Sequence, residues 1–142
     1  MNVLRLSIPP LPRFAGTARR AFAKFAGSHR LETREAECLV FALGEAIANA
    51  IQHAGTREAI EIRVSVKGDA VVVRVTDRGR GIPAPPDGGD LPLPSVYAEE
   101  GRGFAIMQRC TDFLDVDTRP GAGTVVTLGR YRRGHQEVAA VS

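Results

Sequence analysis

The sequence lacks the features that mark membrane and secreted proteins. Its 142 residues hold no long uncharged apolar run, so no membrane-spanning helix is expected. The N-terminal stretch MNVLRLSIPP is too short and too interrupted to be a secretory signal peptide. We therefore expect a cytoplasmic protein that does not bind a membrane.

Cysteine is also scarce, and neither sign of charge dominates. Cys38 and Cys110 lack metal-ligand spacing and lie in helix-like contexts, so we expect reduced, buried thiols, with a disulfide as the alternative. The formal net charge is +3, and basic residues gather near 19–30 and 130–133. Neither cluster has interleaved aromatic residues to stack on bases, so direct nucleic-acid binding is not expected. Solvated faces are the default explanation, followed by attraction of an acidic protein partner or an anionic ligand.

What is present predicts a single domain spanning 1–142, without internal repeats. Apolar residues alternate with polar ones, or recur at helical spacing, between segments rich in glycine and proline. The expected elements are a strand at 3–8, helices at 12–28 and 33–55, strands at 60–66 and 71–76, a helix from Phe104, and strands around 114–116 and 125–128. Strands joined by hairpins predict an α+β fold, a two-layer α/β sandwich with a mostly antiparallel sheet and helices on one face.

Regular patterning disappears between Arg78 and Gly103, a segment that contains five prolines. A structureless stretch of about twenty residues inside a compact domain is commonly a lid or a binding loop. A disordered insertion is the alternative. We place a mobile lid at about 82–102 and expect the polar residues 132–142 to form a flexible tail.

The helix containing residues 37–55 has an unusually thin polar face. At about 100° per residue, Glu45, Asn49 and Gln52 share one narrow sector opposite a bulky apolar stripe. Glu45 is the only fully charged residue within 38–56. Surface helices usually carry several charges, and a buried carboxylate is costly unless it is paired, hydrogen-bonded or beside a metal. Glu45 and Asn49 are therefore candidates to serve one ligand, and a sparse solvent-facing surface is the competing interpretation.

Two glycine-containing sites follow. The first is Asp77-Arg78-Gly79-Arg80-Gly81-Ile82, directly after a strand. Glycine permits positive φ and lets the backbone approach a ligand, and Asp77 is a candidate acceptor for a ligand's amino group. Asp-x-Gly is also ordinary turn chemistry at the end of a strand, so the motif alone does not decide between the two.

The second site is Gly101-Arg102-Gly103, ahead of the helix expected from Phe104. Backbone N–H groups at a helix N-terminus form an anion site, and Arg102 is a candidate for a charge-assisted contact with phosphate. A flexible hinge is the alternative. No GxxxxGK[ST] motif is present and no βαβ unit surrounds the glycines, which excludes a P-loop and disfavours a dinucleotide fold.

Taken together, these sites resemble the motifs of the GHKL (Bergerat-fold) ATP-binding superfamily, which includes gyrase, heat-shock chaperones, histidine kinases and mismatch-repair ATPases. The resemblance covers about Leu4 to Tyr131. The Glu-xxx-Asn motif is matched by Glu45 and Asn49, and the Asp-x-Gly-x-Gly motif by Asp77, Gly79 and Gly81. The Gly-x-Gly motif is matched by Gly101 and Gly103, and a late Gly-Thr by Gly123 and Thr124. Within the superfamily, GEAIANAIQHAG and EEGRGFAIMQRCTDFLDV are most similar to bacterial anti-sigma factor serine/threonine-protein kinases.

The resemblance implies that ATP and Mg²⁺ are bound between the helices and the mobile lid. Asp77 would bind the adenine amino group with support from Thr124, and Asn49 would ligate Mg²⁺. Glu45 would be the general base. The remaining positions that the resemblance assigns to the ATP pocket are Gly79, Gly81, Ile82, Gly101, Arg102, Gly103, Phe104 and His53. His53 is equally well explained as a core histidine with a backbone partner.

The resemblance also implies partners, namely a sigma factor and a STAS-type anti-anti-sigma protein that carries the target serine, and it implies a homodimer. The pocket alone leaves two alternatives open. One is a switch kinase of a signalling scaffold, and the other is a non-catalytic module in which ATP sets conformation. A detached histidine-kinase domain is disfavoured because no histidine-bearing dimerisation helix pair is present.

Overall fold

The computed structural model of the protein describes residues 2–54, 57–79, 102–119 and 121–132. The elements in chain order are β1 (Val3–Ile8), a 3-10 helix η1 (Pro12–Phe14), α1 (Ala15–Ser28), α2 (Thr33–Ala54), β2 (Ile60–Lys67), β3 (Ala70–Asp77), α4 (Arg102–Cys110), β4 (Phe113–Arg119) and β5 (Gly123–Tyr131). The expected order of elements is confirmed in these ranges. Apart from Arg102 and Arg132, the expected lid and tail lie outside the described residues.

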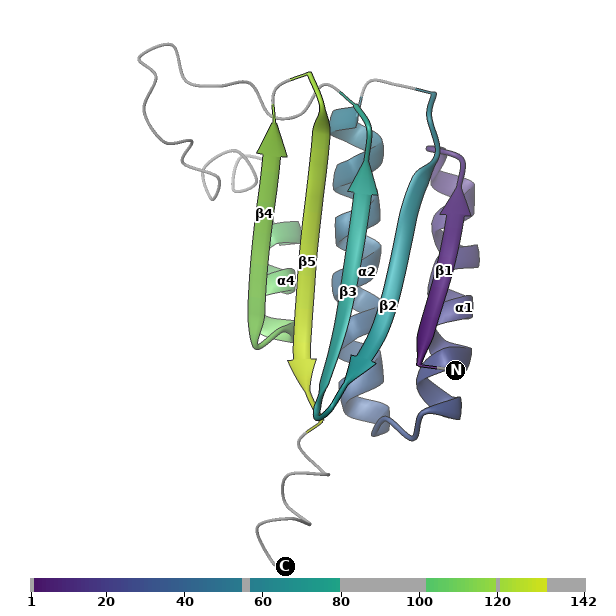
Figure 1. Ribbon diagram of the computed structural model, residues 1–142, viewed down its shortest axis with the longest axis vertical. Coiled ribbons are helices and arrows are strands. Elements are labelled where there is room, and N and C mark those ends of the chain that lie inside the picture. The colour runs from purple at the N-terminus through teal and green to yellow at the C-terminus, as the bar shows by residue number, and fades with distance from the viewer. Residues whose placement is uncertain (1, 55–56, 80–101, 120, 133–142) are drawn as a thin grey trace, which may run out of the picture.

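The five strands form one antiparallel sheet in the order β1-β2-β3-β5-β4. Among the described residues, α1, α2 and α4 all lie on one face of this sheet, and no helix covers the other, open face (Figure 1). α2 is the central helix and contacts β3 and β5, while α1 packs beside it over β1 and α4 packs beside it over β4. The predicted α+β two-layer sandwich is confirmed. None of the helices in the described ranges is long and apolar enough to cross a membrane.

The core lies between the helices and the sheet, and strand alternation builds its sheet side. Every second residue of β2 and β3 is buried against the helices, whereas Glu61, Arg63 and Arg74 are exposed on the open face. Full burial of one aliphatic side chain stabilises a fold by about 1.5–3 kcal/mol, so this layer holds α2 firmly on the sheet. The side chains at its centre are Leu39, Leu43 and Ile47 of α2, Phe22 of α1, and Ile62, Val64, Val73 and Val75 of the sheet.

Of two helix starts, one agrees with expectation and one differs. α2 begins at Thr33 as expected, and the N–H of Ala36 donates to the carbonyl oxygen of Glu32 at 2.9 Å. α4 begins at Arg102, two residues before the expected Phe104. The apolar pattern identifies the buried face of a helix but does not fix the residue at which the helix begins.

Candidate functional site

The two predicted polar residues of α2 differ in burial. Asn49 is only 7% exposed, and its Nδ2 makes no hydrogen bond with any described residue. Glu45, one turn earlier, is half-buried. Of these two residues, Asn49 is therefore the buried one. A buried, unsatisfied polar group costs about 1–3 kcal/mol, and a bound ligand that pairs with it removes that cost.

The Asp77-Arg78-Gly79 segment ends β3 in a tight local turn. Asp77 is the last residue of β3 and is 7% exposed. Its Oδ1 accepts a hydrogen bond from the backbone N–H of Gly79 at 3.0 Å. This bond is the ordinary Asp-x-Gly turn chemistry that the sequence left open, and it also fixes the orientation of the carboxylate at the strand end. Gly81 and Ile82 lie outside the described residues.

Thr124 of β5 lies directly opposite Asp77 in the sheet and is 6% exposed. The Oγ1 atoms of Thr124 and Thr118 are 2.9 Å apart, so one hydroxyl donates to the other. Thr118 thereby orients the hydroxyl of Thr124. The sequence alone did not single out Thr118, because its place beside Thr124 depends on the β4–β5 register.

Gly123 allows the start of β5 to approach the end of β3 closely. Its φ is +97°, in the region that favours glycine. A Cβ at this position would collide with the carbonyl oxygen of Asp77 and would lie 2.9 Å from Cα of Arg78. The Gly-Thr pair therefore acts as one unit, in which glycine permits the approach and threonine supplies the polar group.

These residues gather at one end of the molecule. The last turn of α2, the end of β3 and the start of β5 lie at the same end of the sheet (Figure 1). A hollow of about 510 Å³ opens there, and Asp77, Gly123 and Thr124 are among its walls. Of the two α2 residues, neither Glu45 nor Asn49 is among the described residues that line this hollow. They stand on the helix packed behind β3 and β5.

The other predicted site residues lie at the margins of the described ranges. Arg102, Gly103 and Phe104 form the first turn of α4, and His53 is in the last turn of α2. The side chains of Arg102, Phe104 and His53, and the whole of Gly101, lie outside what the structure describes. The anion site at the start of α4 therefore stays a prediction, on a helix that packs directly against α2.

The two cysteines lie side by side between α2 and α4. Both are free thiols, and each is partly exposed, which corrects the expectation that they are buried. Partial burial and then a hydrogen bond with Cys38 raise the pKa of the Cys110 thiol to about 11. The protonated thiol is the form that folding favours. Its contribution to stability is therefore complete below pH 9.0, the ordinary pKa, and is lost as the pH rises towards about 11.

We expect alkylation of Cys110 in the folded protein to accelerate about tenfold per pH unit above neutrality, because the thiolate is the reactive form. The rise should level off near pH 11 in the folded protein and near pH 9.0 in urea. Mass spectrometry of iodoacetamide-treated protein measures both curves. In a Cys38→Ser control the folded curve should level off at a lower pH, since the thiol partner is lost. A folded wild-type curve that levels off near pH 9 would contradict the assigned environment.

A family model and individual relatives relate this chain to the same group of proteins. The chain matches the family model described as histidine kinase-like ATPase domain over residues 8–130. It is 30% identical over 135 residues to an anti-sigma F factor of Thermoanaerobacter sp. (strain X514), covering 92% of this chain and 94% of that protein. It is 28% identical over 148 residues to the serine-protein kinase RsbW of Bacillus pumilus (strain SAFR-032), covering 95% and 91%.

A solved structure agrees at the level of the fold. It contains the RsbU and RsbW domains of a protein from Mycobacterium tuberculosis, and it superposes on this chain with a TM-score of 0.71 at 18% identity. The match covers 92% of this chain and 32% of that one. At this identity the likeness establishes the architecture, and the chemistry rests on the site itself.

Proposed function

The chain belongs to the histidine kinase-like ATPase domain family, and on that premise we propose that it is a Mg-ATP-dependent protein-serine kinase that acts as an anti-sigma factor. The names of two relatives, an anti-sigma F factor and a serine-protein kinase, support the two halves of the proposal. The observation that carries it is the buried amide of Asn49, whose Nδ2 has no hydrogen-bond partner among the described residues, one turn from the half-buried carboxylate of Glu45.

The adenine base is assigned to the end of β3. A buried carboxylate can accept a hydrogen bond from the exocyclic amino group of adenine. The hydrogen bond from the N–H of Gly79 holds the carboxylate of Asp77 in place for this role. Thr124, oriented by Thr118, offers a second polar group next to it, directly or through water. Guanine carries a carbonyl oxygen where adenine carries the amino group, so a carboxylate at this position favours ATP over GTP.

Asn49 is assigned to Mg²⁺. Oxygen from a neutral amide, together with phosphate oxygens, suits this cation. A half-turn of the side-chain amide exchanges its oxygen and nitrogen, and within the described residues no hydrogen bond from Nδ2 opposes that rotation. When bound, the cation neutralises charge on the phosphates. The backbone N–H groups in the first turn of α4, with Arg102 and Gly103, are assigned to the same phosphates.

Glu45 is assigned as the general base. Its partial exposure keeps the carboxylate within reach of a hydroxyl on another protein. In the transfer step Glu45 takes the proton of the serine hydroxyl, the serine oxygen bonds to the γ-phosphorus, and the bond from that phosphorus to ADP breaks. Phosphoryl transfer depends on positioning and charge neutralisation, so few protein groups are required.

Replacing Asn49 by Leu is expected to raise stability while removing Mg-dependent ATP binding. Leu has a similar volume and eliminates an unsatisfied buried group, which should add about 1 kcal/mol to the free energy of unfolding. Urea titration of the apo protein measures the gain, and calorimetric titration with Mg-ATP measures the loss. Gln52→Leu, on the same sector of α2 but exposed, is the matched control and should change neither quantity much. An apo protein destabilised by Asn49→Leu would show that the amide serves the fold.

The kinase half is tested with purified protein, Mg²⁺, ATP labelled on its γ-phosphate, and candidate STAS-type antagonists from the host. We expect label on one serine of such a partner. If no host protein ever accepts phosphate, the kinase assignment fails, and the domain is then a module in which ATP sets conformation.

The partner half is tested by co-purification from host lysate and mass spectrometry. A sigma factor is expected with the wild-type chain, together with a second copy of the chain if the domain is a homodimer. Recovery of signalling proteins without any sigma factor would move the protein to the class of switch kinases that act on a scaffold.

A further inference from the structure

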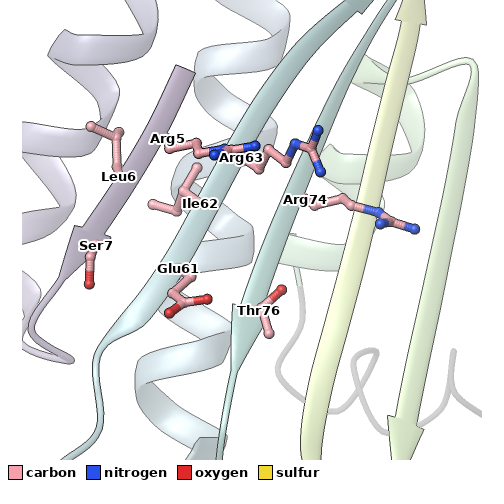
Figure 2. Close-up of a pocket in the computed structure, with 8 residues that line it drawn as sticks. All are labelled: Arg5, Leu6, Ser7, Glu61, Ile62, Arg63, Arg74 and Thr76. Atoms are coloured by element: carbon pink, nitrogen blue, oxygen red, sulfur yellow. The ribbon is translucent and has the colours of Figure 1, made fainter. Parts of the chain in front are cut away.

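The open face of the sheet carries a row of three arginines. Arg5 of β1 lies directly opposite Arg63 of β2, and Arg63 lies directly opposite Arg74 of β3. All three are exposed. Their side chains follow one another across the three strands (Figure 2). Neighbouring strands are about 4.8 Å apart, so the row sets three positive charges within about 10 Å.

This arrangement is unfavourable unless an anion is present. Like charges placed directly opposite each other on adjacent strands destabilise a sheet. In the described ranges, none of the three guanidinium groups has an ion pair or a hydrogen bond. In the neighbouring row, Glu61 lies 3.7 Å from Arg78, with both side chains more than half exposed. In the arginine row itself, the exposed Asp115 of β4 is separated from Arg74 by Thr127 of β5.

A hollow of about 480 Å³ lies over this row. Its walls include the three arginines. They also include Ser7, Glu61 and Thr76, which lie opposite one another and form the next row of the sheet (Figure 2). Three guanidinium groups against one carboxylate leave the hollow positive. Its size falls in the range of small-molecule sites, about 300–1,000 Å³.

We propose that this hollow is a second anion site, which binds a small molecule that carries two or more phosphate groups. The planar guanidinium group donates two parallel hydrogen bonds to a phosphate, and a row of three matches successive phosphates better than a single one. Ser7 and Thr76 add neutral donors on one side, and Glu61 disfavours ligands that extend towards it. Thr76 lines both this hollow and the one at the end of β3, so the two hollows adjoin. The arginine row is distinct from the nucleotide pocket because Arg74 faces the open side of β3, whereas Asp77 of the same strand faces the helices.

Calorimetric titration of the full chain with sodium tripolyphosphate, at low salt and without Mg²⁺, tests the proposal. We expect binding of one equivalent, weakened at least about tenfold by Arg63→Gln, since a hydrogen bond to a charged group is worth that factor. Asp77→Asn, in the nucleotide pocket, and Arg109→Gln, an exposed arginine on α4, should leave it unchanged. Equal loss in all three variants, or none in Arg63→Gln, would overturn the proposal.

Thermal unfolding gives a second, independent measurement. Without ligand, Arg63→Gln should melt higher than wild type, because one like-charge contact is removed. With excess tripolyphosphate the order should reverse, because only wild type binds it tightly. Equal gains from inorganic phosphate would contradict the requirement for two phosphate groups. A change of oligomeric state in Arg63→Gln, with unchanged tripolyphosphate binding, would show that the row contacts another copy of the chain instead.

Discussion

The Glu45→Gln variant should transfer phosphate at least about a hundredfold more slowly than wild type and bind ATP with unchanged affinity. Gln has the shape of Glu but cannot take the proton of the serine hydroxyl, so the loss falls on the transition state. Single-turnover assays with labelled ATP and an accepted partner measure the rate, and calorimetry measures ATP binding. The half-buried position of Glu45 makes the substitution safe for the fold.

Glu37→Gln is the matched control, since Glu37 is an exposed carboxylate on the same helix. It should transfer phosphate at the wild-type rate. A Glu45→Gln variant that is equally fast would remove Glu45 from the chemistry. If transfer is lost but sigma-factor regulation in the host is unaffected, the domain acts as an ATP-dependent binding module.

Gly123→Ala should cost about 3 kcal/mol or more of folding stability and abolish ATP binding. The new methyl group collides with the carbonyl oxygen of Asp77, so the end of β3 and the start of β5 must move apart. That movement separates Asp77 from Thr124, the two residues assigned to adenine. Urea unfolding gives the stability change, and titration with ATP gives the affinity.

Gly121→Ala is the control that distinguishes the steric collision at position 123 from the cost of a positive φ. Gly121 also has positive φ, +80°, but a Cβ there meets nothing within 4 Å. It should lose only about 1 kcal/mol, the cost of the left-handed backbone, and keep its ATP affinity. If the two alanine variants lose the same stability, the close contact between β5 and β3 is not what requires glycine at position 123.

The fold was predictable because its signals are local. Apolar and polar residues alternate in β2, and α2 carries an apolar stripe, so both patterns predict a buried face. The short turns between strands require antiparallel pairing. The motif residues were found by their order and spacing. Their placement on α2, β3, β5 and α4 agrees with that order, whereas their roles in ATP binding stay proposals.

What the sequence concealed depends on contacts between distant segments. Thr118 reaches Thr124, and Cys38 reaches Cys110, only through the register of β4 and the packing of α4 on α2. The partial exposure of Glu45 could not be predicted either. Helical periodicity shows on which side of the helix a residue lies, but not how far neighbouring elements bury that side. Arg63 and Arg74 are ordinary exposed positions when each strand is considered alone.

The turn between β2 and β3 controls both faces of the sheet at once. Gly68, with φ +58°, and Asp69 close the hairpin beyond the pair Lys67–Ala70, and this closure sets which residues of the two strands face each other. Because side chains alternate, a slip of one residue would send Asp77 to the open face and Arg74 into the core. Two strands pair either in one register or in another, so no intermediate register exists. A change at this distant turn would therefore remove both the carboxylate assigned to adenine and the arginine row, in an all-or-none manner.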